Sequence, residues 1–265
     1  MARARDAGLK ITPRQVFEHP RIDRLAAHAL PLATVAAQPE IHDRDLPLTP
    51  VQRRFLARNP QGPGHWTQAV VLELADGLGA DAVAAALDVL TARHDALRLR
   101  FHRDGDGTWH QRLTAAGSRP VQEELAVLEE LAVIDAAMDA AALRLQAAID
   151  ITSGPLVAAG LFRRAAGPDL LMIAIHHLAV DGVSWRVLVD ELGALLADDG
   201  TQAVLPAPTT PWSHWTHALA GHCATPSVQA EADWWRRQLT GAGQVFGPAR
   251  SGCGALWIGR WMATG

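Results

Sequence analysis

The strongest constraint on the fold comes from residues 170–188, where an apolar run ends in two adjacent histidines. Residues 170–175 read Leu-Leu-Met-Ile-Ala-Ile, and His176 and His177 follow directly. A short apolar run of this kind predicts a strand buried on both faces. Residues 184–197 show apolar positions at helical spacing. The segment therefore predicts a buried strand, a turn and a helix, with both histidines at the end of the strand.

The histidines and the turn after them are the candidate site. Successive strand residues point to opposite faces, so His176 and His177 cannot share one environment. One can be held by the fold while the other reaches into a cleft, where an imidazole acts as a general base near neutral pH. Asp181 lies at the turn, where a carboxylate can pair with an arginine and hold the loop.

Other interpretations of these residues compete with a catalytic one. A buried histidine is more often a satisfied core residue. The spacing from the His-His pair to Asp181 lacks the helical HExxH arrangement, so we predict no metal site. Residues 182–186 read Gly-Val-Ser-Trp-Arg, which is not GxSxG, so Ser184 is not predicted to be a nucleophile.

The rest of the chain alternates strand and helix patterns. Strands are expected at 67–74, 97–102, 108–113 and 155–162, with a turn at 104–107 that makes a hairpin of the second and third. A helix capped by Asp81 buries Val83, Ala86, Leu87 and Leu90, and a second helical stretch ends near Ile149. This order predicts an α/β or α+β domain with a covered sheet, in the two-layer arrangement.

The two ends of the chain differ from this domain. Residues 11–30 predict two short helices, the first capped by Thr12 with Pro13 at its first position and the second starting near Ile22. Two such helices cannot bury a core alone. Residues 31–45 are interpreted as a linker and 46–240 as the main domain. Residues 241–265 show neither helical nor strand period and are interpreted as a divergent tail.

Composition excludes several classes of protein. The formal net charge is -4 without a long block of basic residues, so no nucleic-acid partner is predicted. Cys223 and Cys253 are too few for a disulfide framework and lack metal-ligand spacing. No apolar stretch approaches the roughly 20 residues of a membrane-spanning helix, and no signal peptide is evident. We therefore expect a cytoplasmic protein with no membrane partner.

Several motifs together resemble the condensation-type domains of nonribosomal peptide synthetases. Residues 176–182 match the HHxxxDG signature, and the following Val-Ser-Trp is the form typical of the epimerization branch. Residues 47–52 resemble PxTPxQ, and residues 93–101 resemble RHDALRxRF, with Leu99 where peptide-bond-forming members usually carry Thr. Residues 234–236 resemble the segment that closes the first half of such a domain. Residues 11–29 look like the last helices of a peptidyl carrier domain.

The resemblance implies a fold like that of chloramphenicol acetyltransferase, of which this chain holds the first of two lobes. It implies that His177 is catalytic, that His176 is its structural neighbour, and that Asp181 holds the loop by pairing with Arg98 or, as the second choice, Arg93. An alternative for Arg98 is a solvated strand face shared with Arg100 and His102. Gly182, Ser184 and Trp185 are expected to support the site.

The implied reaction is removal and return of the α-proton of an L-aminoacyl or peptidyl thioester, which gives the D form. The substrate arrives on the phosphopantetheine arm of a carrier domain, and no cofactor is expected to bind directly. The expected partners are that carrier domain, a second-lobe chain and neighbouring synthetase modules. The glutamate of the second lobe and a Gly-Gly-x-Ser attachment site are absent from the 265 residues, so we expect the chain to be inactive alone.

Three alternatives remain open from the sequence. The first is a condensation domain that forms peptide bonds with the same histidine. The second is a non-catalytic fragment that docks to a carrier protein or a second-lobe chain. The third is a stand-alone acyltransferase.

Overall fold

The computed structural model describes residues 4, 7–31, 39–42, 44–59, 66–115, 121–128, 131–164, 167–197, 203, 205–240 and 256–262, with the backbone alone for 121–128, 131–137 and 256–262. These residues fall into two compact units, residues 1–38 and residues 39–265. Within the described ranges, no helix has the length and hydropathy needed to cross a membrane.

The first unit holds the two expected helices, α2 (Pro13–Glu18) and α3 (Ile22–His28). Thr12 caps α2 in a capping box with Gln15, and Pro13 occupies the first turn, as expected from the sequence. Two short strands, β1 (Leu9–Lys10) and β2 (Leu30–Pro31), pair antiparallel. No residue of either helix is buried, which agrees with the expectation that two helices cannot form a core. Their assignment to a carrier domain stays a prediction.

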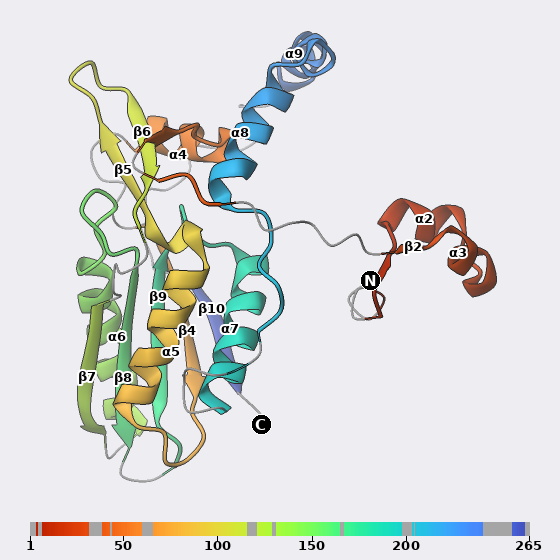
Figure 1. Ribbon diagram of the computed structural model, residues 1–265. Helices are drawn as coiled ribbons and strands as arrows, with labels where there is room; N and C mark the ends of the chain where they lie inside the picture. The colour runs from red at the N-terminus through yellow and green to blue at the C-terminus, as the bar shows by residue number, and fades with distance from the viewer. Residues whose placement is uncertain are drawn as a thin grey trace. The chain divides into compact units, whose positions relative to one another are not determined.

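The second unit is built on a five-stranded mixed sheet in the order β10-β4-β9-β8-β7 (Figure 1). Its strands are β4 (Thr67–Glu73), β7 (Val121–Leu128), β8 (Val157–Arg164), β9 (Leu170–His176) and β10 (Leu256–Met262). The three central strands pair antiparallel, whereas β7 and β10 add at the two edges in parallel. Every residue of β9 is buried, which confirms the two-sided burial predicted from its apolar run.

Helices cover both faces of this sheet. The helices α5 (Ala80–Arg93) and α7 (Gly182–Ala197) lie side by side on one face (Figure 1). The four predicted core residues of α5 are buried there against β4, β8 and β9. The helix α6 (Leu131–Ala147) packs on the opposite face through Ala141 and Leu145. The α+β class is confirmed, with one helical layer more than the two-layer arrangement expected.

A second sheet extends this unit. It has the order β3-β6-β5, with β3 (Asp45–Leu46), β5 (Leu99–Arg103) and β6 (Trp109–Leu113). The hairpin β5–β6 is the predicted one, and its turn places Gly107 at φ +90. A short 3-10 helix, η2 (Asp95–Arg98), leads into β5. Helices α4 (Pro50–Arg58), α8 (Trp212–Cys223) and α9 (Pro226–Leu239) complete the described part.

Four features differ from the sequence-based expectations. The helix α5 is capped by Gly79, two residues before Asp81. The strand β7 was not predicted. Residues 256–262, expected to lie in a divergent tail, form the edge strand β10 beside β4, and 241–255 and 263–265 lie outside the described residues. Residues 39–42, expected to belong to a linker, bond to the second unit.

Candidate functional site

The strand β9 delivers the two histidines to different faces of the sheet. In the antiparallel register, Gln68 of β4 lies opposite Ile175, and Thr67 lies opposite His176. Opposed residues of an antiparallel pair point to the same face, and successive residues alternate. Gln68, Ile175 and His177 therefore share the face covered by α7, whereas His176 points to the other face. This agrees with the expectation that the pair cannot share one environment.

His176 is enclosed by the fold. Its side chain is fully buried, and its Nδ1 accepts a hydrogen bond of 3.1 Å from the backbone amide of Leu178. The ring of Phe55 stands edge-on to it at a centroid distance of 6.2 Å. These contacts hold the His176 ring inside the fold, next to the turn.

His177 is partly buried and is held at both ring nitrogens. Its Nδ1 lies 2.7 Å from the carbonyl oxygen of Val180, and its Nε2 lies 3.1 Å from Nε2 of Gln68. A carbonyl oxygen only accepts, so we assign the proton of the neutral ring to Nδ1. The indole Nε1 of Trp185 donates to Oε1 of Gln68 at 3.0 Å. An indole only donates, so the amide N–H groups of Gln68 face the imidazole and leave a lone pair on His177 Nε2.

Two residues of this site were not predicted from the sequence. Gln68 is buried in β4 and contacts both His177 and Trp185. Trp66 directly precedes β4, and its carbonyl oxygen accepts a hydrogen bond of 2.8 Å from the backbone amide of His177. Its half-exposed ring has its centroid 6.0 Å from that of the His177 imidazole. The available signal was a glutamine directly before the apolar run 69–72 of a predicted strand, because a buried polar side chain requires a partner.

Asp181 caps α7. Its Oδ1 accepts from the backbone amides of Val183 and Ser184 at 3.0 and 2.8 Å, and from the Ser184 hydroxyl at 2.7 Å. The hydrogen bonds from Ser184 and Val183 hold the pKa of the Asp181 carboxyl below its usual value. Ser184 is thus a donor to a carboxylate. Gly182 is the first residue of α7, and a Cβ there would meet no atom within 4 Å.

The predicted pairing of Asp181 with an arginine is wrong for both candidates. Arg93 donates through Nε to Glu191 of α7 at 3.0 Å and through a terminal nitrogen to the carbonyl of Pro206. His94 lies 2.6 Å from the same Glu191 oxygen. Glu191 is buried, so Arg93 and His94 tie the end of α5 to the middle of α7 instead of reaching the loop.

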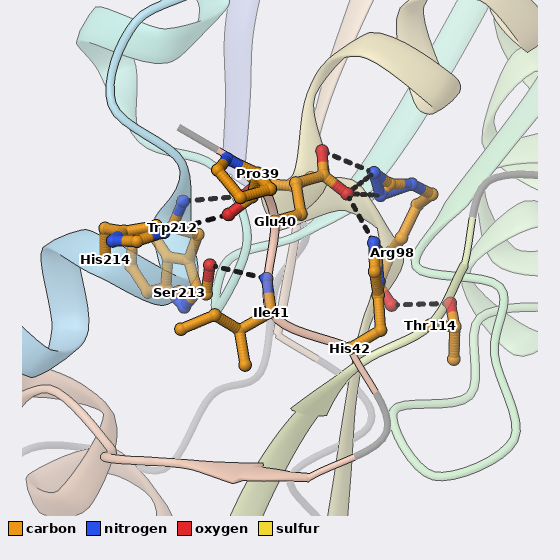
Figure 2. A network of polar contacts seen from close by, with 10 residues as sticks. Pro39, Glu40, Ile41, His42, Arg98, Thr114, Trp212, Ser213 and His214 are labelled. Carbon is orange, nitrogen blue, oxygen red and sulfur yellow. Dashed lines mark hydrogen bonds and ion pairs between the residues drawn. The ribbon is translucent and has the colours of Figure 1, made fainter. Parts of the chain in front are cut away.

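Arg98 pairs with Glu40 (Figure 2). One terminal nitrogen of Arg98 lies 2.9 and 2.7 Å from the two Glu40 oxygens. The arginine is 1% exposed, so the alternative of a solvated strand face is also wrong. A buried guanidinium requires a carboxylate, and residues 39–42 supply one.

Residues 39–42 also bind α8, as Figure 2 shows. The amide of Ile41 donates to Oγ of Ser213 at 3.1 Å, and the His214 ring lies 2.8 Å from the carbonyl of Pro39. The segment therefore connects η2 with the start of α8 by polar contacts.

The described residues contain no group of three or more His, Cys, Asp and Glu side chains able to hold a metal ion. The ring nitrogens of His177 face a carbonyl oxygen and an amide. The arrangement suits proton transfer at Nε2, because the imidazole is oriented by its two contacts and is partly buried.

This site lies inside a segment that matches a known family. Residues 42–247 match the family model described as Condensation domain. The chain belongs to the condensation-domain family. The resemblance inferred from the sequence is confirmed at the level of the condensation and epimerization superfamily of nonribosomal peptide synthetases.

Curated relatives of this condensation-family chain are much longer proteins. The chain is 36% identical over 249 residues to chondramide synthase cmdD of Chondromyces crocatus, which covers 89% of this chain and 6% of that protein. It is 31% identical over 234 residues to malformin synthetase mlfA of Aspergillus niger, covering 85% of this chain and 5% of that protein. The chain thus spans a small part of the relatives it matches.

Solved structures confirm the fold. The epimerization domain from the third module of tyrocidine synthetase B is similar with a TM-score of 0.67 and 31% identity, over 76% of this chain and 47% of that chain. The first condensation domain of the calcium-dependent antibiotic synthetase has a TM-score of 0.61 at 18% identity, over 75% and 48%, and shows the fold alone. The chain spans about half of each. The lobe expected from the sequence, of chloramphenicol acetyltransferase type, is confirmed.

Proposed function

We propose that this chain takes part in epimerization of an L-aminoacyl or peptidyl thioester, with His177 as the general base. The substrate is presented on the phosphopantetheine arm of a carrier domain, and the chain binds no cofactor of its own. The observation that carries the proposal is the contact of His177 Nδ1 with the carbonyl oxygen of Val180 at 2.7 Å, from which the tautomer is assigned. Its Nδ1 proton is held by Val180, so the Nε2 lone pair, which faces the Gln68 amide in this structure, is the one that can take the α-proton.

The chemistry requires an oriented neutral base beside the acidified α-carbon of a thioester. Asp181 contributes by capping α7 and fixing the turn that carries His177. Trp185 contributes through Gln68. His176 supports the end of the strand from the opposite face. Arg98 and Arg93 act at a distance, by holding neighbouring segments in place.

The similarity to the tyrocidine synthetase epimerization domain at 31% identity supports this reaction. A condensation reaction at the same histidine is the second candidate, because the matched family is described by that activity. Partners proposed for either reaction are a carrier domain, a second-lobe chain and neighbouring modules. Residues 1–30 are proposed to be the last helices of such a carrier domain.

The test is α-proton exchange. A separate carrier domain is loaded with an L-aminoacyl-phosphopantetheine and incubated with this chain in deuterium oxide, and the label at the α-carbon is followed by mass. The chain is expected not to epimerize alone, because the second-lobe glutamate is absent from it, but exchange of the α-proton with solvent requires only the base. We therefore expect exchange that disappears in His177→Ala. The matched control is His222→Ala, which removes an exposed imidazole from the end of α8 and should leave exchange unchanged.

Two outcomes oppose the proposal. A folded wild-type chain that gives no exchange with any of a panel of aminoacyl groups would exclude base catalysis by this chain. Formation of a peptide bond when a second loaded carrier is added, without exchange, would favour the condensation reaction instead.

A further inference from the structure

Gln68 stands between the proposed base and the core of the sheet. Its Oε1 accepts from Trp185 at 3.0 Å, and its Nε2 lies 3.1 Å from His177 Nε2. The side chain is 5% exposed, so water contributes little to its orientation. Because the indole fixes which end of the amide faces outward, an N–H donor is held beside the lone pair of the base.

This donor is an uncharged polar group beside the proposed base, and two neighbouring donors are already engaged. The Ser184 hydroxyl already donates to Asp181, and the Trp185 indole already donates to Gln68. An amide nitrogen carries two N–H groups, and one of them suffices for the contact with His177. Gln68 can therefore donate elsewhere without breaking its bond with Trp185.

We propose that Gln68 donates a hydrogen bond to the thioester carbonyl oxygen while His177 removes the neighbouring α-proton. This rests on the proposed function. In the substrate-free site the Gln68 N–H occupies the lone pair of His177 Nε2. The α C–H of the substrate takes that place, and the amide N–H, still oriented by the bond between Gln68 and Trp185, donates to the carbonyl oxygen two bonds from the α-carbon.

The step balances within the site and the substrate. The C–H bond breaks, and a new N–H bond forms at His177 Nε2. The freed electron pair forms the enolate double bond as the carbonyl pair moves onto oxygen. The negative charge then lies on the oxygen that accepts from Gln68. A preorganised donor at such an oxygen stabilises the transition state more than the ground state.

The first test needs no substrate. Long-range proton–nitrogen NMR spectra of the labelled chain report which imidazole nitrogen carries the proton and whether the other accepts a hydrogen bond. We expect Nδ1 protonated and Nε2 unprotonated and hydrogen-bonded in the wild type. In Gln68→Met the Nε2 resonance should move to the position of an unbonded nitrogen. An identical Nε2 resonance in both proteins would overturn the placement of Gln68, whatever the activity.

The second test is the exchange rate with a loaded carrier. Removal of one such donor typically lowers kcat by about 10²–10³-fold, and we expect a loss of this size in Gln68→Met with KM changed less. Trp185→Phe retains the ring but loses the N–H, so it should show a smaller loss. The matched control is Gln111→Met, because Gln111 is fully buried in β6 and bonds to Gln52 and Pro47.

The outcomes separate the two proposals. Gln68→Met with an exchange rate close to wild type, or Gln111→Met with an equal loss, would overturn the role of Gln68. Exchange that depends on His177 but not on Gln68 would leave the proposed function standing. Absence of exchange in the folded wild type would overturn both.

Discussion

The buried pair of Arg98 and Glu40 makes an asymmetric prediction, because its two members differ in access to water. Arg98 is 1% exposed and the Glu40 side chain is 27% exposed. The Nε of Arg98 is also buried without a hydrogen-bond partner among the described atoms. Glu40→Ala therefore leaves the buried Arg98 cation without a counter-charge. Arg98→Met leaves a carboxylate that can turn into water while the methionine fills the space of the arginine stem.

The magnitudes follow from that difference. Removing one partner of a buried pair costs about 3–5 kcal/mol, because the remaining charge is uncompensated. Solvent reaches Glu40, so we expect the lower end, about 3 kcal/mol, for Glu40→Ala. Arg98→Met should cost about 1–2 kcal/mol, since its partner can be hydrated. The double variant removes both charges and should be more stable than Glu40→Ala alone.

The assay is equilibrium unfolding in urea, followed by the fluorescence of the nine tryptophans. A shift of the midpoint at constant slope reports a change in stability. Combining the variants in a double-mutant cycle gives the coupling free energy between positions 40 and 98. A second cycle between Arg98 and Asp181 should give coupling near zero, because Asp181 bonds to Val183 and Ser184.

Equal small effects of Glu40→Ala and Arg98→Met would contradict this asymmetry, and so would a stronger coupling of Arg98 to Asp181 than to Glu40. The second result would restore the pairing that the sequence motif suggests. A changed slope in Glu40→Ala alone would show instead that residues 39–42 had come away from the domain.

Three further predictions concern the turn, a glycine and the surface. Asp181→Ala should destabilise the chain by about 1 kcal/mol at neutral pH through loss of the helix cap. Since the folded-state pKa of Asp181 is lowered, the stability difference between wild type and variant should persist above the usual carboxyl pKa and vanish as the pH falls through the lowered value. Urea unfolding at a series of pH values measures it, and a difference independent of pH would contradict the prediction. Gly154→Ala should cost at least about 1–2 kcal/mol, because Gly154 has φ +80 and a Cβ would lie 2.0 Å from Cζ of Arg100; an unchanged midpoint in thermal unfolding would refute this. Trp234 and Trp235 expose about half of their surface on α9, so replacing both with Ser should reduce self-association in size-exclusion chromatography. A wild-type chain that is monomeric at all concentrations would refute this prediction.

Local patterns predicted the central elements well. The six apolar residues before His176 predicted a strand buried on both faces, and β9 is buried throughout. Thr12 and Pro13 predicted the start of α2. The stripe from Val83 to Leu90 identified the buried face of α5. Each of these depends on residues close together in the chain, where backbone geometry alone relates spacing to direction.

Edge strands were harder to predict. The strand β10 adds parallel to β4 across a long stretch of sequence, and its residues show no clean alternation. The strand β7 likewise gains its hydrogen bonds from β8. A strand at the edge of a sheet is stabilised by its partner, so its own sequence carries a weak signal.

The sequence by itself determined the strand–turn–helix unit, the separation of His176 from His177 and the family to which the chain belongs. Only the tertiary structure decided the partners of the charged and polar residues. Arg98 bonds to Glu40, Arg93 to Glu191, and Gln68 to His177. Hydrogen bonds require approach within about 3 Å, and that approach is set by how distant segments pack, whereas direction along a strand or helix is set by the local backbone.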